Sequence, residues 1–155
     1  MEVTCQCRTV SFLTPTPSPL AVYHCHCTEC RKQSSSAYGT SAIFPAAGLF
    51  PLSADLSSKL AVWSRPSNEG RTVDCYFCKE CGVRVMHRIR EPDGTERDTV
   101  IMKGGLVQGL KWEGAAHIYT KSAVVEIPKG VERWEGAPGE MPGRKEKEET
   151  GGERK

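Results

Sequence analysis

The cysteines of this chain fall into short clusters whose spacing suits metal binding. Eight cysteines occur in 155 residues, in the groups Cys5-x-Cys7, Cys25-x-Cys27-x-x-Cys30 and Cys75-x-x-Cys78-x-x-Cys81. A zinc ion takes four ligands in a tetrahedron, and two cysteines separated by two residues around a tight turn can occupy one edge of it. The spacings of ferredoxin iron–sulfur clusters do not occur, which favours zinc.

Other uses of cysteine explain the pattern less well. Cys78 and Cys81 have the spacing of a redox pair, but the flanking residues indicate a β-hairpin rather than a strand followed by a helix. Any single cysteine could be a buried, inert thiol. The first residues, "MEVTCQCRTV", have neither the basic segment nor the apolar run of a secretory signal. We therefore expect a cytoplasmic protein, where disulfides are rare.

Ligand counting divides the cysteines into two sets. One set of four would form a closed, structural zinc site: Cys5, Cys7, Cys78 and Cys81. The other set offers three ligands and an open position, as in catalytic zinc sites: Cys25, Cys27 and Cys30. Cys75 leaves a second possibility open, because as a fourth ligand it would close the second site too. We favour the open site.

The histidines are candidates for packing around the sites. His24 and His26 flank Cys25, and in a strand they would point to the face opposite the cysteines. We expect them to pack beside the metal rather than bind it. His87 and His117 stand alone in strand-like runs, where core or surface roles are the default.

Short β-like runs separated by turn signals dominate the chain, which predicts a mostly antiparallel all-β domain over residues 1–137. The only helical segment predicted is a short one at Thr28–Gln33. The strands are expected at Val10–Leu13, Leu20–His24, Tyr38–Phe44, Lys59–Ser64, Thr72–Phe77, Val83–Ile89, Asp98–Lys103 and Ala123–Ile127. Residues 138–155, "PGEMPGRKEKEETGGERK", predict a disordered charged tail, because they could bury little apolar surface.

Charge and hydropathy exclude two classes of function. Lys and Arg number 21 against 19 Asp and Glu, whereas a dedicated nucleic-acid binder usually presents a strongly basic face. No run of apolar residues is long enough to cross a membrane. We expect neither a nucleic-acid partner nor a membrane partner.

The clusters resemble those of the glutathione-dependent formaldehyde-activating enzyme family, which is shared with centromere protein V. The resemblance rests on "CQC" at 5–7, "CHCTECRKQSS" at 25–35, "FCKECGVRV" at 77–85 and "HIYTKSAVVEIPKGVERWEGAP" at 117–138. It implies a small β-tent fold with two zinc ions, a structural one on the four-cysteine set and a catalytic one on the three-cysteine set. Two residues depart from the family pattern: Ser35, where glycine is frequent, and Cys75, where cysteine is not.

The implied activity is the addition of glutathione to formaldehyde, a carbon–sulfur lyase reaction run in reverse. An open zinc position would bind the thiol and favour its thiolate, which is the nucleophile. Four cations near the clusters could then hold the carboxylates of glutathione: Arg31, Lys32, Arg84 and Arg88. The competing hypothesis is a zinc-stabilised binding module without catalysis.

Overall fold

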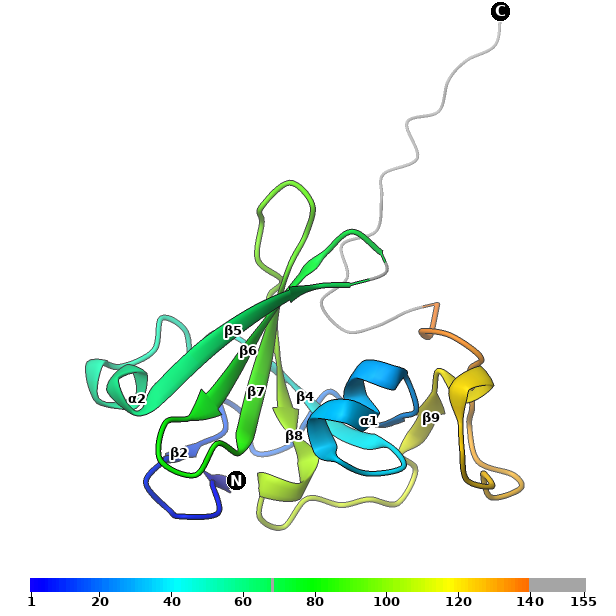
Figure 1. Ribbon diagram of the computed structural model, residues 1–155. Helices are drawn as coiled ribbons and strands as arrows, with labels where there is room; N and C mark the ends of the chain where they lie inside the picture. Colours follow the sequence, from blue (N-terminus) through cyan, green and yellow to red (C-terminus); the bar gives the residue numbers. More distant parts are fainter. Residues whose placement is uncertain (68, 140–155) are drawn as a thin grey trace, which may run out of the picture.

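A single bent sheet organises the chain, as the computed structural model shows for residues 1–67 and 69–139 (Figure 1). Its seven strands lie in the order β5-β6-β7-β8-β4-β3-β9. In that order they span Leu60–Pro66, Thr72–Cys78, Arg84–Arg90, Thr99–Lys103, Gly39–Pro45, Ala21–Cys25 and Ala116–Ile118. A separate pair, β1 (Glu2–Thr4) and β2 (Ser11–Leu13), lies beside it. The predicted all-β fold is confirmed.

Helical segments are short, and all but the last in the described chain lie between strands. The α-helices are α1 (Thr28–Ser34) and α2 (Ala54–Lys59), and two 3₁₀ turns follow, η1 (Gly104–Leu106) and η2 (Thr120–Ser122). The predicted helix at 28–33 is confirmed as α1, whereas α2 was not predicted. Among the helices in the described part of the chain, none is long and apolar enough to cross a membrane.

Seven of the eight predicted strands are present within one or two residues of their expected bounds. The prediction for 123–127 was wrong, because this segment is irregular backbone with bends. Val124 and Val125 are exposed there and meet no partner strand that would select their β-branched side chains. The last strand is instead β9, which joins the sheet parallel to β3 in an otherwise antiparallel arrangement. The predicted tail lies outside the described residues from position 140 onward.

Two cores lie on opposite faces of the sheet. Alternation along the strands places Ala42, Phe44 and Met102 on one face, in what we call the first core, which also contains Cys5 and Cys78. The second core lies on the other face and consists of Tyr23, Cys25, Cys30, Ile43, Ala116 and Ile118. The two cysteine sets are therefore built into different faces of one sheet.

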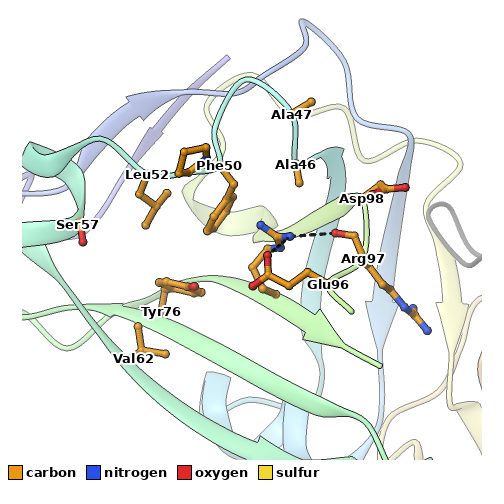
Figure 2. Close-up of a pocket in the computed structure, with 12 residues that line it drawn as sticks. Ala46, Ala47, Phe50, Leu52, Ser57, Val62, Tyr76, Glu96, Arg97 and Asp98 are labelled. Atoms are coloured by element: carbon orange, nitrogen blue, oxygen red, sulfur yellow. Dashed lines mark hydrogen bonds and ion pairs between the residues drawn. The ribbon is translucent and has the colours of Figure 1, made fainter. Parts of the chain in front are cut away.

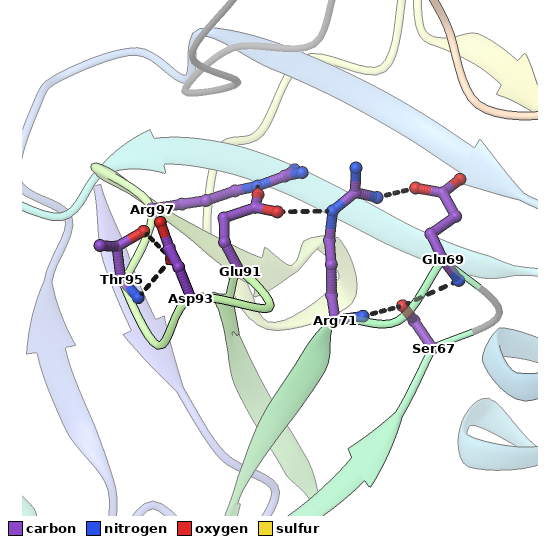
Figure 3. A network of polar contacts seen from close by, with 7 residues as sticks. All are labelled: Ser67, Glu69, Arg71, Glu91, Asp93, Thr95 and Arg97. Atoms are coloured by element: carbon purple, nitrogen blue, oxygen red, sulfur yellow. Dashed lines mark hydrogen bonds and ion pairs between the residues drawn. The ribbon is translucent and has the colours of Figure 1, made fainter. Parts of the chain in front are cut away.

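A network of ion pairs fastens the loops at one end of the sheet (Figure 3). Glu91 accepts from Arg71 Nε at 2.9 Å and from Arg97 Nε at 2.6 Å. Arg71 also pairs with Glu69 in the loop between β5 and β6. Because Arg97 is almost fully buried, these charge-assisted bonds hold the β5–β6 loop against the turn that follows β7.

Candidate metal centres

The four-cysteine set comes together at the edge of the first core. The Sγ atoms of Cys5, Cys7, Cys78 and Cys81 all lie within 4.8 Å of one another. Two turns present them: Arg8 and Gly82 adopt left-handed conformations, with φ of 68° and 72°. The Gly82 amide donates to the Cys78 carbonyl at 3.0 Å, which closes the tight turn that carries Cys78 and Cys81. Four sulfurs at these distances fit a closed tetrahedral zinc site.

The three-cysteine set gathers where β3 ends and α1 begins. The Sγ atoms of Cys25, Cys27 and Cys30 lie within 4.8 Å of one another. Cys27 is the N-cap of α1, and its sulfur accepts from the Cys30 amide at 3.4 Å. The parallel pairing of β3 with β9 holds the approach to this turn, since the His26 amide donates to the Ile118 carbonyl at 2.9 Å.

Helix α1 can pack this closely only because position 39 is a glycine. A Cβ added at Gly39 would lie 3.0 Å from Cys30 Cβ and 3.2 Å from the Cys30 carbonyl oxygen. At the other end of α1, Ser35 forms the C-cap in a left-handed conformation, with φ 48° and ψ 43°. Glycine adopts that conformation without strain, whereas serine, which has a Cβ, does not.

Cys75 does not join the three-cysteine set. It lies fully buried in β6, and its thiol contacts the Val73 carbonyl oxygen at 3.6 Å. Within residues 1–67 and 69–139, no further histidine, cysteine or carboxylate lies close enough to the three sulfurs to act as a fourth ligand. The second site therefore has the donor count of a zinc with one position left for another ligand.

Comparison with known families agrees with this arrangement. The profile of the glutathione-dependent formaldehyde-activating enzymes matches residues 1–122, a span that contains all eight cysteines. The chain belongs to that family. Among curated proteins, none matches it. Membership in this family of formaldehyde-activating enzymes points to an activity that involves glutathione and formaldehyde, and both sulfur sets fit the zinc that such chemistry would use.

The thiols of both sets have perturbed acidities. A hydrogen bond with the Thr9 hydroxyl lowers the pKa of Cys7 to about 6, whereas burial raises the pKa of Cys78 to about 11. In the second set, the bond that Cys25 donates lowers the pKa of Cys27, and the same bond raises the pKa of Cys25. Without a cation, each set stabilises only part of its thiols as thiolates. A metal ion is what would make all of them ligands.

The histidines lie outside both sulfur sets. His26 is fully buried, and its Nε2 lies 2.9 Å from Nδ1 of His117 in β9. His24 stacks on Trp112 with ring centroids 5.8 Å apart. This aromatic and imidazole cluster packs against the end of β3, just before α1. It fixes the backbone that presents Cys25 and Cys27.

Three of the four cations predicted to hold carboxylates are engaged elsewhere. Lys32 is exposed and pairs with Glu29 at 3.1 Å, and Arg31 donates to the Ser122 carbonyl at 3.3 Å. Arg88 lies on the face of the first core and pairs with Glu96 at 2.8 Å. Arg84 lies on the face that carries the three-cysteine set, and its buried Nη1 has no hydrogen-bond partner in the described chain.

One cation near the three cysteines was missed. Lys103, at the end of β8, is 9% exposed, and Cys30 and Cys25 oppose the lowering of its pKa that burial causes. A lysine at the end of a predicted strand is usually solvated, so the local sequence gave no indication that Lys103 is buried. Only the pairing of β8 with β4, which places Lys103 opposite Ser41, reveals its position.

An open pocket of about 820 Å³ lies on the other face of the sheet and includes none of the cysteines. Figure 2 shows Phe50 and Leu52 on one side of it, and Tyr76 and Val62 on the other. The guanidinium of Arg88 stacks 4.2 Å from the Phe50 ring and donates to Glu96 and to the Arg97 carbonyl. Its charge is therefore already matched.

Proposed function

We propose that this protein is a zinc-dependent enzyme that adds glutathione, or a related thiol, to formaldehyde. The zinc bound by Cys5, Cys7, Cys78 and Cys81 would be structural, and the zinc bound by Cys25, Cys27 and Cys30 would be catalytic. The bond that forms joins the thiol sulfur to the carbon of formaldehyde, and the thiol proton ends on the carbonyl oxygen. Run in reverse, this is a carbon–sulfur lyase reaction.

The observation that carries the proposal is the three-sulfur set without a fourth protein ligand. Zinc held there would supply an open position that favours the thiolate form of an incoming thiol. Other residues of the chain position the cysteine ligands and add charge beside them. Helix α1 fixes Cys27 and Cys30 through the N-cap bond. Burial lowers the pKa of Lys103, but thiolates at Cys30 and Cys25 favour its positively charged form. That charge offsets the repulsion between the cysteine thiolates and the substrate thiolate.

The test is a rate measurement, because glutathione also adds to formaldehyde unaided. Exchange between glutathione and its hydroxymethyl adduct is followed by NMR at equilibrium, with and without protein. The zinc-loaded protein should accelerate exchange above the spontaneous rate. Cys27→Ser should abolish the acceleration, and the matched variant Cys75→Ser should keep it, because Cys75 lies outside the sulfur set. Two bound zincs without acceleration would support the non-catalytic binding module instead.

A further inference from the structure

Three buried side-chain nitrogens on the face of the second core have no hydrogen-bond partner. They are Arg84 Nη1, His87 Nε2 and Lys103 Nζ, from the neighbouring strands β7 and β8. His87 is 4% exposed and Lys103 is 9% exposed. Buried polar groups in folded proteins are almost always paired. Arg84 Nη1 and Lys103 Nζ are donors, so their lack of a partner indicates a missing acceptor.

A β-bulge puts Arg84 on this face. Tyr76 pairs with Met86 and Phe77 pairs with Arg84, which leaves Val85 as an extra residue in β7. Val85 and Met86 both pack in the first core. Arg84 and His87, on either side of them, therefore both face the second core. The position of the Arg84 guanidinium agrees, since it lies 5.9 Å from the centre of the Phe77 ring.

Lys103 connects this group to the cysteines. It pairs with Ser41 in β4, and two residues earlier Gly39 pairs with Cys25, so Lys103 and Cys25 share a face. Electrostatic coupling follows the same order. Burial lowers the pKa of Lys103, Cys30 and Cys25 raise it, and Arg84 lowers it further. Burial lowers the pKa of His87, and Lys103 and Arg84 lower it further. The side chains form a row that leads from the sulfurs to Arg84.

The charges along this row do not balance without a ligand. A zinc with three thiolates carries one net negative charge, which Lys103 would neutralise. Arg84 then has no counter-ion, because no acidic side chain pairs with it within residues 1–67 and 69–139. A thiolate on the zinc would balance this charge in sum, but its sulfur would lie at the metal. An acceptor for the unpaired nitrogens of Arg84 and Lys103 must therefore come from another part of the ligand.

We propose that Arg84 and Lys103, with His87 between them, bind a carboxylate of the thiol whose sulfur occupies the three-cysteine site. This inference rests on the proposed function and adds a selectivity to it: thiols that carry a carboxylate bind, and their uncharged counterparts bind poorly. Arg84 and Lys103 are positioning residues, because they would bind the carboxylate, a part of the substrate that is distant from the reacting atoms. The solvent-exposed Trp63, whose ring lies 5.8 Å from the Arg84 guanidinium, forms the outer wall.

The test compares two thiols that differ only in charge, 3-mercaptopropionate and 3-mercaptopropanamide. The protein is loaded with Co²⁺, and thiol binding is followed by the sulfur-to-cobalt absorption, which reports binding without turnover. The carboxylate thiol should bind roughly 10- to 100-fold more tightly, the range expected for hydrogen bonds to a charged group. Arg84→Met should remove most of this preference and leave the affinity for the amide unchanged. Lys103→Met should weaken the binding of both thiols, because its charge also opposes that of the cysteines, but it should weaken the carboxylate thiol more. The control, Lys32→Met, removes an exposed cation on α1 and should change neither affinity.

Equal binding of both thiols to the unmodified protein would overturn the carboxylate site and leave the open metal position standing. Equal weakening of both thiols by Lys103→Met would also overturn it, because Lys103 would then only balance the charge of the cysteines. Binding of neither thiol would overturn the proposed function, and this inference with it. Because Arg84 is only partly buried, its variant keeps the test decisive if the Lys103 variant fails to fold.

Discussion

Cys25 and Cys78 lie on opposite faces of the same sheet, Cys25 in the second core and Cys78 in the first. Each belongs to a separate set of sulfurs. The first set joins the turn after β1 to the end of β6, far apart in sequence, whereas the second lies within six residues of the chain. The two sites share no ligand, so the loss of one should leave the other intact.

Cys78→Ser and Cys27→Ser should therefore have different effects on stability. Each variant should lose one zinc, measured as metal per chain. Cys78→Ser should lower the free energy of unfolding by more than about 3 kcal/mol, because its site ties distant parts of the chain together. Cys27→Ser should cost clearly less, since its site closes a short loop and serine still caps α1. Equal costs in denaturant titrations would contradict separate structural and catalytic roles.

Gly39→Ala should disturb the three-cysteine site without touching a ligand. The new methyl group would lie 3.0 Å from Cys30 Cβ, which forces α1 away from β4 and costs about 1 to 3 kcal/mol. We expect weaker zinc binding at the second site, measured by competition with a chelator. Gly105→Ala is the control, because nothing lies within 4 Å of its added methyl. A zinc affinity equal to that of the unmodified protein would show that the close approach of α1 to Gly39 is not needed for metal binding.

Ser35→Gly should stabilise the protein by up to about 1 kcal/mol. Ser35 caps α1 with φ 48°, a conformation that costs a residue with a Cβ but not glycine. Ser57→Gly, in the exposed part of α2, should instead lower the free energy of unfolding by about 0.5 to 1 kcal/mol. Thermal unfolding of both variants measures the difference. Destabilisation by Ser35→Gly would mean that its side chain makes a contact worth more than the strain.

Asp74 should contribute to stability in a pH-dependent way. Its carboxylate accepts from Arg90 Nε at 2.7 Å and from Nη2 at 2.8 Å, and these bonds lower its pKa. A lowered folded-state pKa means that the stabilisation is fully present above the ordinary value near 3.9 and is lost as pH falls through the folded-state value.

Asp74→Asn should cost about 1.5 to 3 kcal/mol at pH 7, and the cost should stay constant between roughly pH 6 and pH 8. Asp55→Asn removes a more exposed pair with Lys59 and should cost less than about 1 kcal/mol. Urea titrations at several pH values measure both. A cost for Asp74→Asn that grows as the pH falls within that window would contradict the depressed pKa.

The sequence predicted the long strands and the cysteine clusters, because both depend on local spacing. The turn at Gly82 is one example, because it depends only on neighbouring residues. The grouping of Cys5 and Cys7 with Cys78 and Cys81 was predicted by counting ligands. Features set by distant contacts were missed. Strand β9 has three residues and exists because β3 lies beside it. Lys103 is buried because β8 is an interior strand, and the bulge that turns Arg84 inward depends on the register between β6 and β7.

The open position at Cys25, Cys27 and Cys30 is the central claim, and ¹¹³Cd NMR of the cadmium-loaded protein tests it most directly. The cadmium chemical shift separates four-sulfur from three-sulfur coordination. We predict two resonances, one of each kind, from the two sulfur sets. Glutathione should move only the three-sulfur resonance into the four-sulfur range, and Cys75→Ser should give the same result. Two four-sulfur resonances before glutathione is added, or a three-sulfur resonance that glutathione does not move, would contradict the account.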